Sequence, residues 1–532
     1  MPQLRPYQLD LLNQAIRATT QHQRVVVQLP TGGGKSPIQA TLLDRYTSKH
    51  PHQSALLLVD RGKLLEQMEA TIREWSNPNL TISIINANSK TPPPAQLYIA
   101  MVETIARRID KPYFKHLLGK VGIIMVDEAH MGNFTKVLTH PILSECKVFG
   151  FTATPIFASN KFPMNKLYNT IVTGKQVGEL IEMGSLVQNY TLASELAVSM
   201  SDLSVKNGRI DDEQQGKLLS ATKYVKETVN KYVEWALGKK TIVYNANKSH
   251  NKIVCAEFVA RGYDAKAVDD DTSEAERSAV LRWYRSTPDA ILCNVGLYTK
   301  GFDEPAIECV MQNKKTLSLP LYLQMVGRGG RTHPNKTHFI NIDMHRNIDI
   351  HGDWNWDRDW AFIFKSGKVK KDGVPPIKDC PKCGCIVPAS TSVCSGIYFY
   401  PSTELFDGGS EPCGYIWERT QAEIAEEQAI KLKLETKNVS IDALLSSNTF
   451  GHKSDWQIAI QLMKDVARGA VGAYYIQPDG VGVGSIYNEC ILKVKEYQRK
   501  GGNIKLNAWI KEQCHEIVNS AIKSKWPEFE NA

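Results

Sequence analysis

The segment Gln28–Ser36 reads Gln-Leu-Pro-Thr-Gly-Gly-Gly-Lys-Ser and has the residue types of a phosphate-binding loop. The apolar run Val25–Val27 precedes it and a stretch with helical spacing, Pro37–Tyr46, follows it. Glycines let backbone N–H groups surround an anion, a lysine adds positive charge, and a serine hydroxyl can ligate Mg²⁺. Leu29 replaces the first glycine of the strict pattern, so a solvated glycine-rich turn is the alternative. The residues expected to contact phosphate are Thr31, Gly32, Gly33, Gly34, Lys35 and Ser36.

Two adjacent acids, Asp127 and Glu128, follow the apolar run Ile123–Val126. Ligands of open α/β sheets bind at the carboxyl ends of strands, so both carboxylates are expected beside the phosphate loop. There Asp127 can hold Mg²⁺ through water, and Glu128 can orient and deprotonate a water that attacks the γ-phosphate. The alternative is a helix N-terminus, where acidic residues interact favourably with the macrodipole.

A glycine-rich basic segment, Gln324–Arg331, places Arg328 and Arg331 three residues apart. At that spacing two guanidinium groups can approach one anion together. Arginines in this arrangement neutralise charge that develops on a transferring phosphoryl group. A basic turn that contacts solvent or nucleic-acid phosphate is the alternative.

Short apolar runs alternate with amphipathic stretches before and after these motifs. Ala55–Val59 is followed by a helical stretch at Lys63–Trp75, and the alternation restarts at Thr241–Tyr244 and continues through Ala290–Cys293. This alternation is typical of an α/β fold with doubly wound parallel sheets.

Taken in chain order, six motifs resemble those of superfamily 2 helicases of the DEAD/DEAH type. In that family the phosphate loop is usually Thr-Gly-x-Gly-Lys-[Ser/Thr], which Thr31–Ser36 fits, so Leu29 no longer counts against it. The resemblance covers about residues 1–345. Its motifs are Arg5 with Gln8, Thr31–Ser36, Asp127–His130, Thr152–Thr154, Thr299–Asp303 and Gln324–Arg331.

The resemblance implies two tandem RecA-like domains with ATP in the cleft between them and nucleic acid bound across both. Cleft closure on binding and reopening after hydrolysis would move the nucleic acid. The implied ATP-site residues are Arg5 and Gln8 for adenine, Lys35 and Ser36 for phosphate and Mg²⁺, Asp127 and Glu128 as above, Gln324 for the attacking water, and Arg328 and Arg331 as arginine fingers. Asp303 is implied at the ribose edge or at a coupling point, and His130, Thr152 and Thr154 would couple the nucleotide state to the nucleic-acid face.

The segment Gln176–Tyr190 resembles the bridge of RadD-, XPB- and UvsW-like helicases, and this resemblance favours DNA over RNA. Remodelling of forked or branched DNA is the implied task, with RNA unwinding as the alternative. A motor subunit that uses ATP to grip DNA within a nuclease or defence complex is a third hypothesis.

Five of the eleven cysteines lie between Cys380 and Cys413, and clustering of this kind favours a metal over disulfides in a chain without a secretion signal. Four thiolates would satisfy tetrahedral Zn²⁺, although Cys385 competes as a ligand and reduced structural cysteines are the alternative. RadD-like helicases carry cysteine-rich C-terminal zinc elements. The expected ligands are Cys380, Cys383, Cys394 and Cys413.

We therefore expect five segments. They are a first RecA-like domain at 1–190, a linker or insertion at 191–237, a second RecA-like domain at 238–364, a zinc-binding element at 365–420 and a small α-rich accessory domain at 421–532. The polar residues 201–220 are expected to form a solvated linker, with a helix as the alternative. Trp354, Trp356 and Trp360 alternate with aspartates, which repel phosphate, so we expect these rings to pack against the motor rather than stack on bases.

Composition and charge are those of an ordinary globular protein. The 532 residues carry a formal charge of +8, which is compatible with a polyanionic partner. The segment Lys493–Lys525 has eight basic and three acidic residues and can hold a DNA backbone or form a solvated basic face. Protein partners are expected through the C-terminal domain. The absence of a run of about 18 apolar residues and of a signal-peptide core predicts no membrane partner and a cytoplasmic location, with a nucleoid or viral replication context included.

Overall fold

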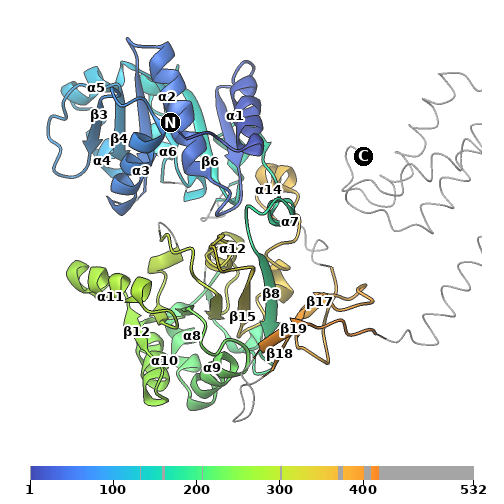
Figure 1. Ribbon diagram of the computed structural model, residues 1–532. Coiled ribbons are helices and arrows are strands. Elements are labelled where there is room, and N and C mark those ends of the chain that lie inside the picture. The colour runs from blue at the N-terminus through green and yellow to red at the C-terminus, as the bar shows by residue number, and fades with distance from the viewer. Residues whose placement is uncertain are drawn as a thin grey trace, which may run out of the picture. The chain divides into compact units, whose positions relative to one another are not determined.

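The computed structural model describes residues 2–60, 62–131, 133–157, 162–206, 208–299, 302–369, 375–400 and 409–417. The chain divides into two compact units, 1–416 and 417–532. The first unit holds two parallel sheets and a cysteine-rich element (Figure 1). The expected accessory domain at 421–532, including the basic segment Lys493–Lys525, lies outside the described residues.

The first sheet has seven parallel strands in the order β3-β4-β2-β5-β6-β1-β7. Its inner strands are continuous apolar runs buried on both faces, as expected for a parallel sheet covered by helices. The strands are β1 Arg24–Gln28, β2 Ser54–Val59, β3 Ile82–Ile85, β4 Leu97–Met101, β5 Val121–Val126, β6 Lys147–Thr152 and β7 Thr170–Thr173. The α-helices are α1 Pro6–Ala18, α2 Lys35–Lys49, α3 Gly62–Trp75, α4 Val102–Arg108, α5 Pro112–Leu118, α6 Thr135–Leu138 and α7 Val177–Glu182.

The second sheet has six parallel strands in the order β12-β13-β11-β14-β15-β8. The edge strand β8 pairs with β15 from Gln188 to Ala193, so the boundary expected at residue 190 falls inside a strand of the second domain. The strands are β8 Gln188–Ala193, β11 Thr241–Asn245, β12 Ala265–Val268, β13 Ile291–Asn294, β14 Cys309–Asn313 and β15 His338–Asp343. The α-helices are α8 Asp212–Leu219, α9 Thr222–Trp235, α10 Lys248–Ala260, α11 Glu274–Ser286, α12 Leu319–Val326, α13 Ile348–His351 and α14 Trp360–Ser366.

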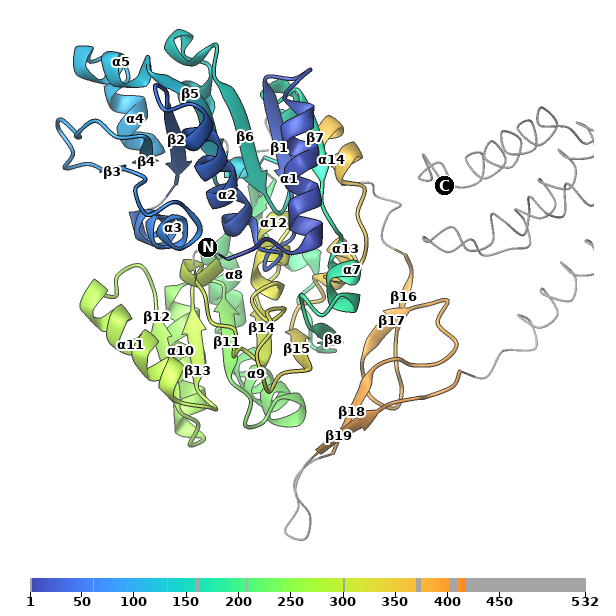
Figure 2. The same cartoon turned by 45° about the horizontal axis from the view of Figure 1, so that its top comes forward.

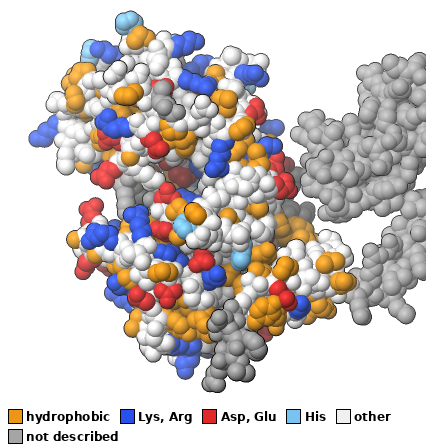
Figure 3. All heavy atoms as spheres, in the orientation of Figure 1, with side chains coloured by type: hydrophobic (Ala, Val, Ile, Leu, Met, Phe, Trp, Pro, Cys, Tyr) orange, Lys and Arg blue, Asp and Glu red, His pale blue; other side chains and the backbone are white. Residues whose placement is uncertain are grey.

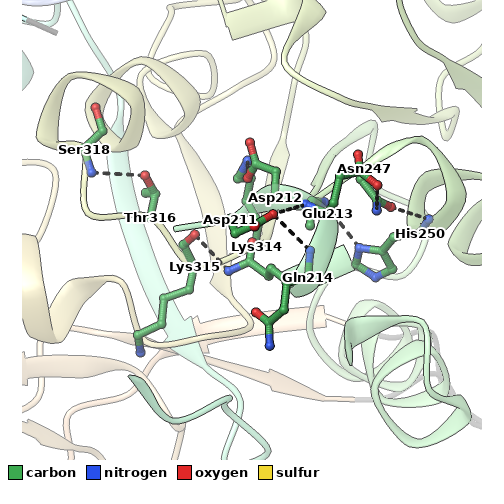
Figure 4. Close-up of polar contacts among 12 residues, drawn as sticks. Asp211, Asp212, Glu213, Gln214, Asn247, His250, Lys314, Lys315, Thr316 and Ser318 are labelled. Atoms are coloured by element: carbon green, nitrogen blue, oxygen red, sulfur yellow. Dashed lines mark hydrogen bonds and ion pairs between the residues drawn. The ribbon is translucent and has the colours of Figure 1, made fainter. Parts of the chain in front are cut away.

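The segment expected to be a linker is instead folded onto the second domain. A short hairpin of β9 Val205–Lys206 and β10 Arg209–Ile210 leads into α8, which begins with Asp211 as its N-cap. Figure 4 shows the polar contacts that join α8 to the strand ends beside it. Asp212 pairs with Lys314 at 2.7 Å, and Gln215 donates to the Lys315 carbonyl at 3.1 Å. The polar composition of this segment predicted exposure to solvent. The prediction was wrong because the partners of these polar groups lie on distant segments and are not apparent from the local sequence.

The helix α14 carries the chain back to the first domain, so the second-domain limit expected at 364 falls inside a helix. It packs on β7, and its Phe364 belongs to the apolar core of the first domain with Phe157 and Tyr168. The indole of Trp360 donates to the Gln176 side chain at 3.0 Å. Trp354 and Trp360 are 1% and 4% exposed, which confirms for these two rings the expectation that they pack against the two domains, whereas Trp356 is half-buried.

The cysteine-rich element consists of two antiparallel hairpins, and it lies beside β8 in both views (Figures 1 and 2). Its strands are β16 Ile377–Asp379, β17 Ile386–Pro388, β18 Ile397–Tyr400 and β19 Gly409–Pro412. Among all helices that the described part of the chain contains, none has the length and apolar character needed to cross a membrane.

The return of α14 to the first domain predicts unequal effects of two phenylalanine truncations. Phe364→Ala removes a ring that is 2% exposed and should cost about 3–5 kcal/mol of unfolding free energy. Phe362→Ala, on the same helix but only half-buried, should cost clearly less. Urea unfolding followed by tryptophan fluorescence measures the difference, and equal losses would contradict the packing described.

Candidate active site and metal centre

The phosphate loop connects β1 to α2, in the strand-loop-helix order that the sequence predicted. The helix begins at Lys35, and its N-cap Gly34 has a φ of 83°, a left-handed conformation that favours glycine. The Lys35 ammonium donates to the carbonyls of Leu29 at 3.1 Å and Pro30 at 3.4 Å. Burial lowers the pKa of Lys35, whereas the charges of Glu128 and Asp127 act in the opposite direction. A cationic group therefore stands at the helix N-terminus with both acids near it.

Two residues at the start of α1 hold the loop from the other side. The Gln8 amide nitrogen donates to the carbonyls of Gly33 at 3.3 Å and Gly34 at 3.4 Å, and its oxygen accepts from the Arg5 backbone at 2.9 Å. The Tyr7 hydroxyl also donates to Gly33, at 3.0 Å. A Cβ at Gly34 would lie 2.1 Å from the Gln8 nitrogen, so this close approach requires glycine. Gln8 thus braces the loop backbone, and adenine contact by Arg5 and Gln8 stays a prediction.

The two acids lie just beyond β5, as expected. Burial, reinforced by the neighbouring Glu128 charge, raises the pKa of Asp127 to about 6. Its Oδ1 accepts from the Gln39 amide at 3.0 Å. Glu128 has a φ of 49°, which is uncommon for a residue with a side chain and marks a constrained turn. A desolvated carboxylate next to another gains from a cation, and oxygen ligands of this kind suit Mg²⁺.

His130 connects the acidic motif to two others. Its Nδ1 lies 3.0 Å from the Thr152 hydroxyl and 3.3 Å from Glu128 Oε2, and its Nε2 lies 3.3 Å from the Gln324 amide nitrogen. Because an amide N–H donates, Nε2 acts as the acceptor, and Nδ1 then carries the proton toward Thr152 and Glu128. The Thr152 hydroxyl in turn accepts from the Thr154 backbone at 3.0 Å. Gln324 lies on α12, so this network joins the two domains.

The two arginines share one backbone anchor. Nη1 of Arg328 donates to the Phe302 carbonyl at 2.6 Å, and Nη1 of Arg331 donates to the same oxygen at 3.2 Å. Arg331 also forms an ion pair with Asp303. Burial lowers the pKa of Arg331 to about 10 and lowers that of Arg328, while the Glu128 charge raises the Arg328 value. Arg328 therefore lies within electrostatic reach of the acid expected to activate water.

One cavity of about 520 Å³ gathers these groups from both domains. The molecular surface is hollowed where the domains meet, and acidic and basic side chains are interspersed around it (Figure 3). Gln324 does not line the cavity and reaches the site through His130. The predicted residues that line it are Arg5, Gln8, Thr31, Gly32, Gly33, Gly34, Lys35, Ser36, Asp127, Glu128, Asp303, Arg328 and Arg331.

A face of α3 also lines this cavity, and the sequence analysis missed it. The helix was expected, but nothing in its amphipathic pattern distinguished a cavity wall from a core face. The signal available in the sequence was that the lining residues of α3 recur at intervals of three and four, which places them on one face of the helix. The lining residues are Leu64, Gln67, Met68, Thr71, Glu74 and Trp75.

The cysteine cluster forms a second centre, on the cysteine-rich element. The Sγ atoms of Cys380, Cys383, Cys394 and Cys413 all lie within 4.8 Å of one another, and the residues are buried. Cys385 stands outside this set, and its thiol donates to the Ile397 carbonyl at 3.6 Å.

The long gap between the third and fourth cysteines is explained by a hairpin. Cys394 precedes β18 and Cys413 follows β19, so antiparallel pairing returns the chain to its starting point. Gly384 and Gly414, directly after two of the cysteines, have φ of 71° and 59° and allow the reversals there. Four converging thiols fit the tetrahedral ligand set of Zn²⁺.

The cluster predicts different metal contents for two serine variants. Cys413→Ser removes one of the four converging thiols and should sharply lower the zinc retained by purified protein. Cys385→Ser should leave the zinc content unchanged, because this sulfur has a backbone partner instead. Elemental analysis of both variants decides the ligand set, and loss of zinc in Cys385→Ser would place that residue among the ligands.

Two family models match parts of the two parallel-sheet domains. The model for the type III restriction enzyme, res subunit, matches residues 1–157, and the model for the helicase conserved C-terminal domain matches residues 224–333. Both matches agree with the resemblance to superfamily 2 helicases that the sequence motifs carry. Between them the matched ranges contain the phosphate loop, both acids and both arginines.

Proteins similar to this chain come from yeast and from a phage. The Saccharomyces cerevisiae protein IRC3, which bears the name of an ATP-dependent helicase, is 28% identical over 64% of this chain and 51% of its own length. A 51.5 kDa protein of a Lactococcus phage is 28% identical over 82% of this chain and 88% of its own length. The chain therefore spans about half of the yeast relative.

Similarity to restriction enzymes extends to a solved structure. The EcoKI type I restriction endonuclease subunit of Escherichia coli is 24% identical over 65% of this chain and 34% of its own length. A structure named as a fragment of an HsdR subunit from Vibrio vulnificus superposes with a TM-score of 0.51 at 17% identity, covering 68% of this chain and 67% of that one. This likeness supports the fold of two α/β domains.

Proposed function

We propose that this chain hydrolyses ATP in the cavity between its two α/β domains and uses the cycle to move along DNA. The observation that carries the proposal is the single cavity that brings the phosphate loop, Asp127 with Glu128, and Arg328 with Arg331 together from both domains. Groups for binding phosphate, activating water and neutralising charge are all required for phosphoryl transfer.

Each residue has a role that its surroundings support. Lys35 and the loop amides hold the phosphates, and Ser36 with Asp127 would hold Mg²⁺, which supplies charge neutralisation when bound. Glu128 acts as the base for the attacking water. Arg328 and Arg331 stabilise the charge of the transition state, and their shared Phe302 anchor keeps them together.

The contact between Gln324 and His130 is the proposed connection between hydrolysis and movement. It crosses from the second domain to a histidine that also contacts Glu128 and Thr152. A change at the γ-phosphate that shifts Glu128 would therefore alter a contact between domains. Closure and reopening of the domains would then advance the bound strand.

Two observations favour DNA as the substrate. The segment Gln176–Tyr190 resembles the bridge of helicases that act on DNA, and restriction-enzyme subunits are among the relatives. We infer forked or branched DNA as the preferred structure. RNA unwinding is the second candidate, and a DNA-gripping subunit of a larger complex is favoured by the same restriction-enzyme relatives.

Zn²⁺ is the proposed occupant of the four-cysteine cluster, where it would fix the two hairpins beside β8. Its role is therefore structural, because four thiolates leave no open position for chemistry.

Substitution of the proposed base predicts loss of hydrolysis with retention of nucleotide. Glu128→Gln should lower ATPase activity by roughly 10²-fold or more, the usual scale for losing a general base. Binding of fluorescent ADP should persist, since Lys35 and the loop remain. Persistence of normal turnover in this variant would remove Glu128 from the proposed role.

Nucleic acids should stimulate the ATPase unequally. We expect the largest stimulation by forked DNA, then single-stranded or duplex DNA, and the least by RNA, measured with wild-type protein at one fixed salt concentration because phosphate contacts are salt-dependent. Equal stimulation by DNA and RNA, or none by either, would contradict the DNA assignment.

Because the proposed site lies between the two domains, we predict that turnover needs an arginine of the second domain, which does not carry the phosphate loop. Arg328→Ala should lower kcat by about 10³-fold, the lower end of the effect of an arginine finger. Arg282→Ala, on the exposed side of α11 in the same domain, is the matched control and should keep wild-type turnover. Equal activities of the two variants would exclude Arg328 as a finger.

A further inference from the structure

Gln39 is a buried polar residue of α2 to which no motif assigns a role. It follows Lys35 by four residues and therefore shares its face of the helix. Its neighbours Ile38 and Ala40 belong to the core, and Gln39 itself is 0% exposed. Burying an amide is costly unless its polar atoms are satisfied, so a partner for each atom is expected.

The nitrogen and the oxygen of this amide have different surroundings. Nε2 donates to Asp127 Oδ1 at 3.0 Å. This orientation follows from chemistry, because a carboxylate oxygen accepts and an amide oxygen would repel it. Oε1 is buried and has no hydrogen-bond partner within the described residues. An acceptor is thus left over next to a carboxylate expected to hold an ion.

We propose that Gln39 is a positioning residue of the Mg²⁺ site. Its nitrogen fixes the Asp127 carboxylate, and its oxygen accepts from a water that hydrates the ion. The inference rests on the proposed ATP site and deepens it. The hydrogen bond from Gln39 to Asp127 also connects the two segments that carry the expected Mg²⁺ ligands. Ser36 lies on α2 together with Gln39, and Asp127 directly follows β5.

The chemistry of Mg²⁺ explains why such a residue is useful. This ion demands near-octahedral geometry and keeps several of its waters, so groups that orient its ligands and waters matter. Partners of metal ligands typically change metal affinity or activity by 10–100-fold when they are removed. A purely structural tie between α2 and β5 would instead affect stability without changing the response to the metal.

The test compares binding with and without metal. Gln39→Met keeps length and approximate volume but removes both polar atoms, and Gln39→Leu is a second variant with the same loss. Gln215→Leu is the matched control, because Gln215 is also 0% exposed, donates one hydrogen bond at 3.1 Å and has a buried oxygen without a described partner. The probe is fluorescent ADP, titrated in EDTA and then across Mg²⁺ concentrations.

We expect both Gln39 variants to need about tenfold more Mg²⁺ to reach half of the metal-dependent gain in ADP affinity. Affinity in EDTA should match the wild type, and Gln215→Leu should show the wild-type Mg²⁺ midpoint. An unchanged midpoint in either folded Gln39 variant would overturn the proposal. So would equal losses in EDTA and in Mg²⁺, which indicate general damage to the site.

Failure of the proposed function gives a different result. Suppose that wild-type protein binds ADP in a Mg²⁺-dependent way but does not hydrolyse ATP. The proposed motor function then fails, whereas the comparison of Gln39 variants still tests whether Gln39 positions the Mg²⁺ site. The Mg²⁺ dependence of ATPase adds a second readout, in which a positioning role raises the Mg²⁺ requirement more than it lowers turnover at saturating metal.

Discussion

Desolvation of opposite charges at the place where two sheets meet is the constraint on which the rest of this unit depends. Asp127 and Arg328 are buried. Burial raises the pKa of Asp127 and lowers the pKa of Arg328, and both shifts favour the neutral form of the side chain. The Lys35 charge opposes part of that cost at Asp127, and the Glu128 charge opposes part of it at Arg328. A buried charge without its partner is strongly destabilising, so the surrounding framework must keep these groups in register.

The framework does so by crossing between the domains twice. The chain leaves the first sheet at β7 and enters the second at β8, then returns through α14 to pack on β7 again. Trp360 and Gln176 hydrogen-bond where the two crossings meet. Both connections between the domains therefore contact β7 or the helix after it.

The sequence predicted the chemical groups better than the arrangement that holds them. Lys35, Glu128 and Arg328 stand in local patterns whose spacing alone indicates their chemistry, and the structure brings them to one cavity. The crossing by β8, the packing of α8 and the return of α14 depend on partners a hundred or more residues away, as for Gln215 with Lys315. Gln39 was missed for a similar reason, since a single glutamine in a helix gives no signal until Asp127 is seen beside it.

The cysteine-rich element illustrates how such long-range partners solve a structural problem. The strand β8 is at the edge of the second sheet, and unpaired edges invite aggregation. Leu192 of β8 forms an antiparallel bridge with Cys385, and Ile386 packs with Ala193 and Ile348. The element therefore covers the edge at the point where the chain has just crossed between domains. Cys385, which is not among the four converging thiols, belongs to this contact with β8, so these five cysteines divide between the converging set and the sheet edge.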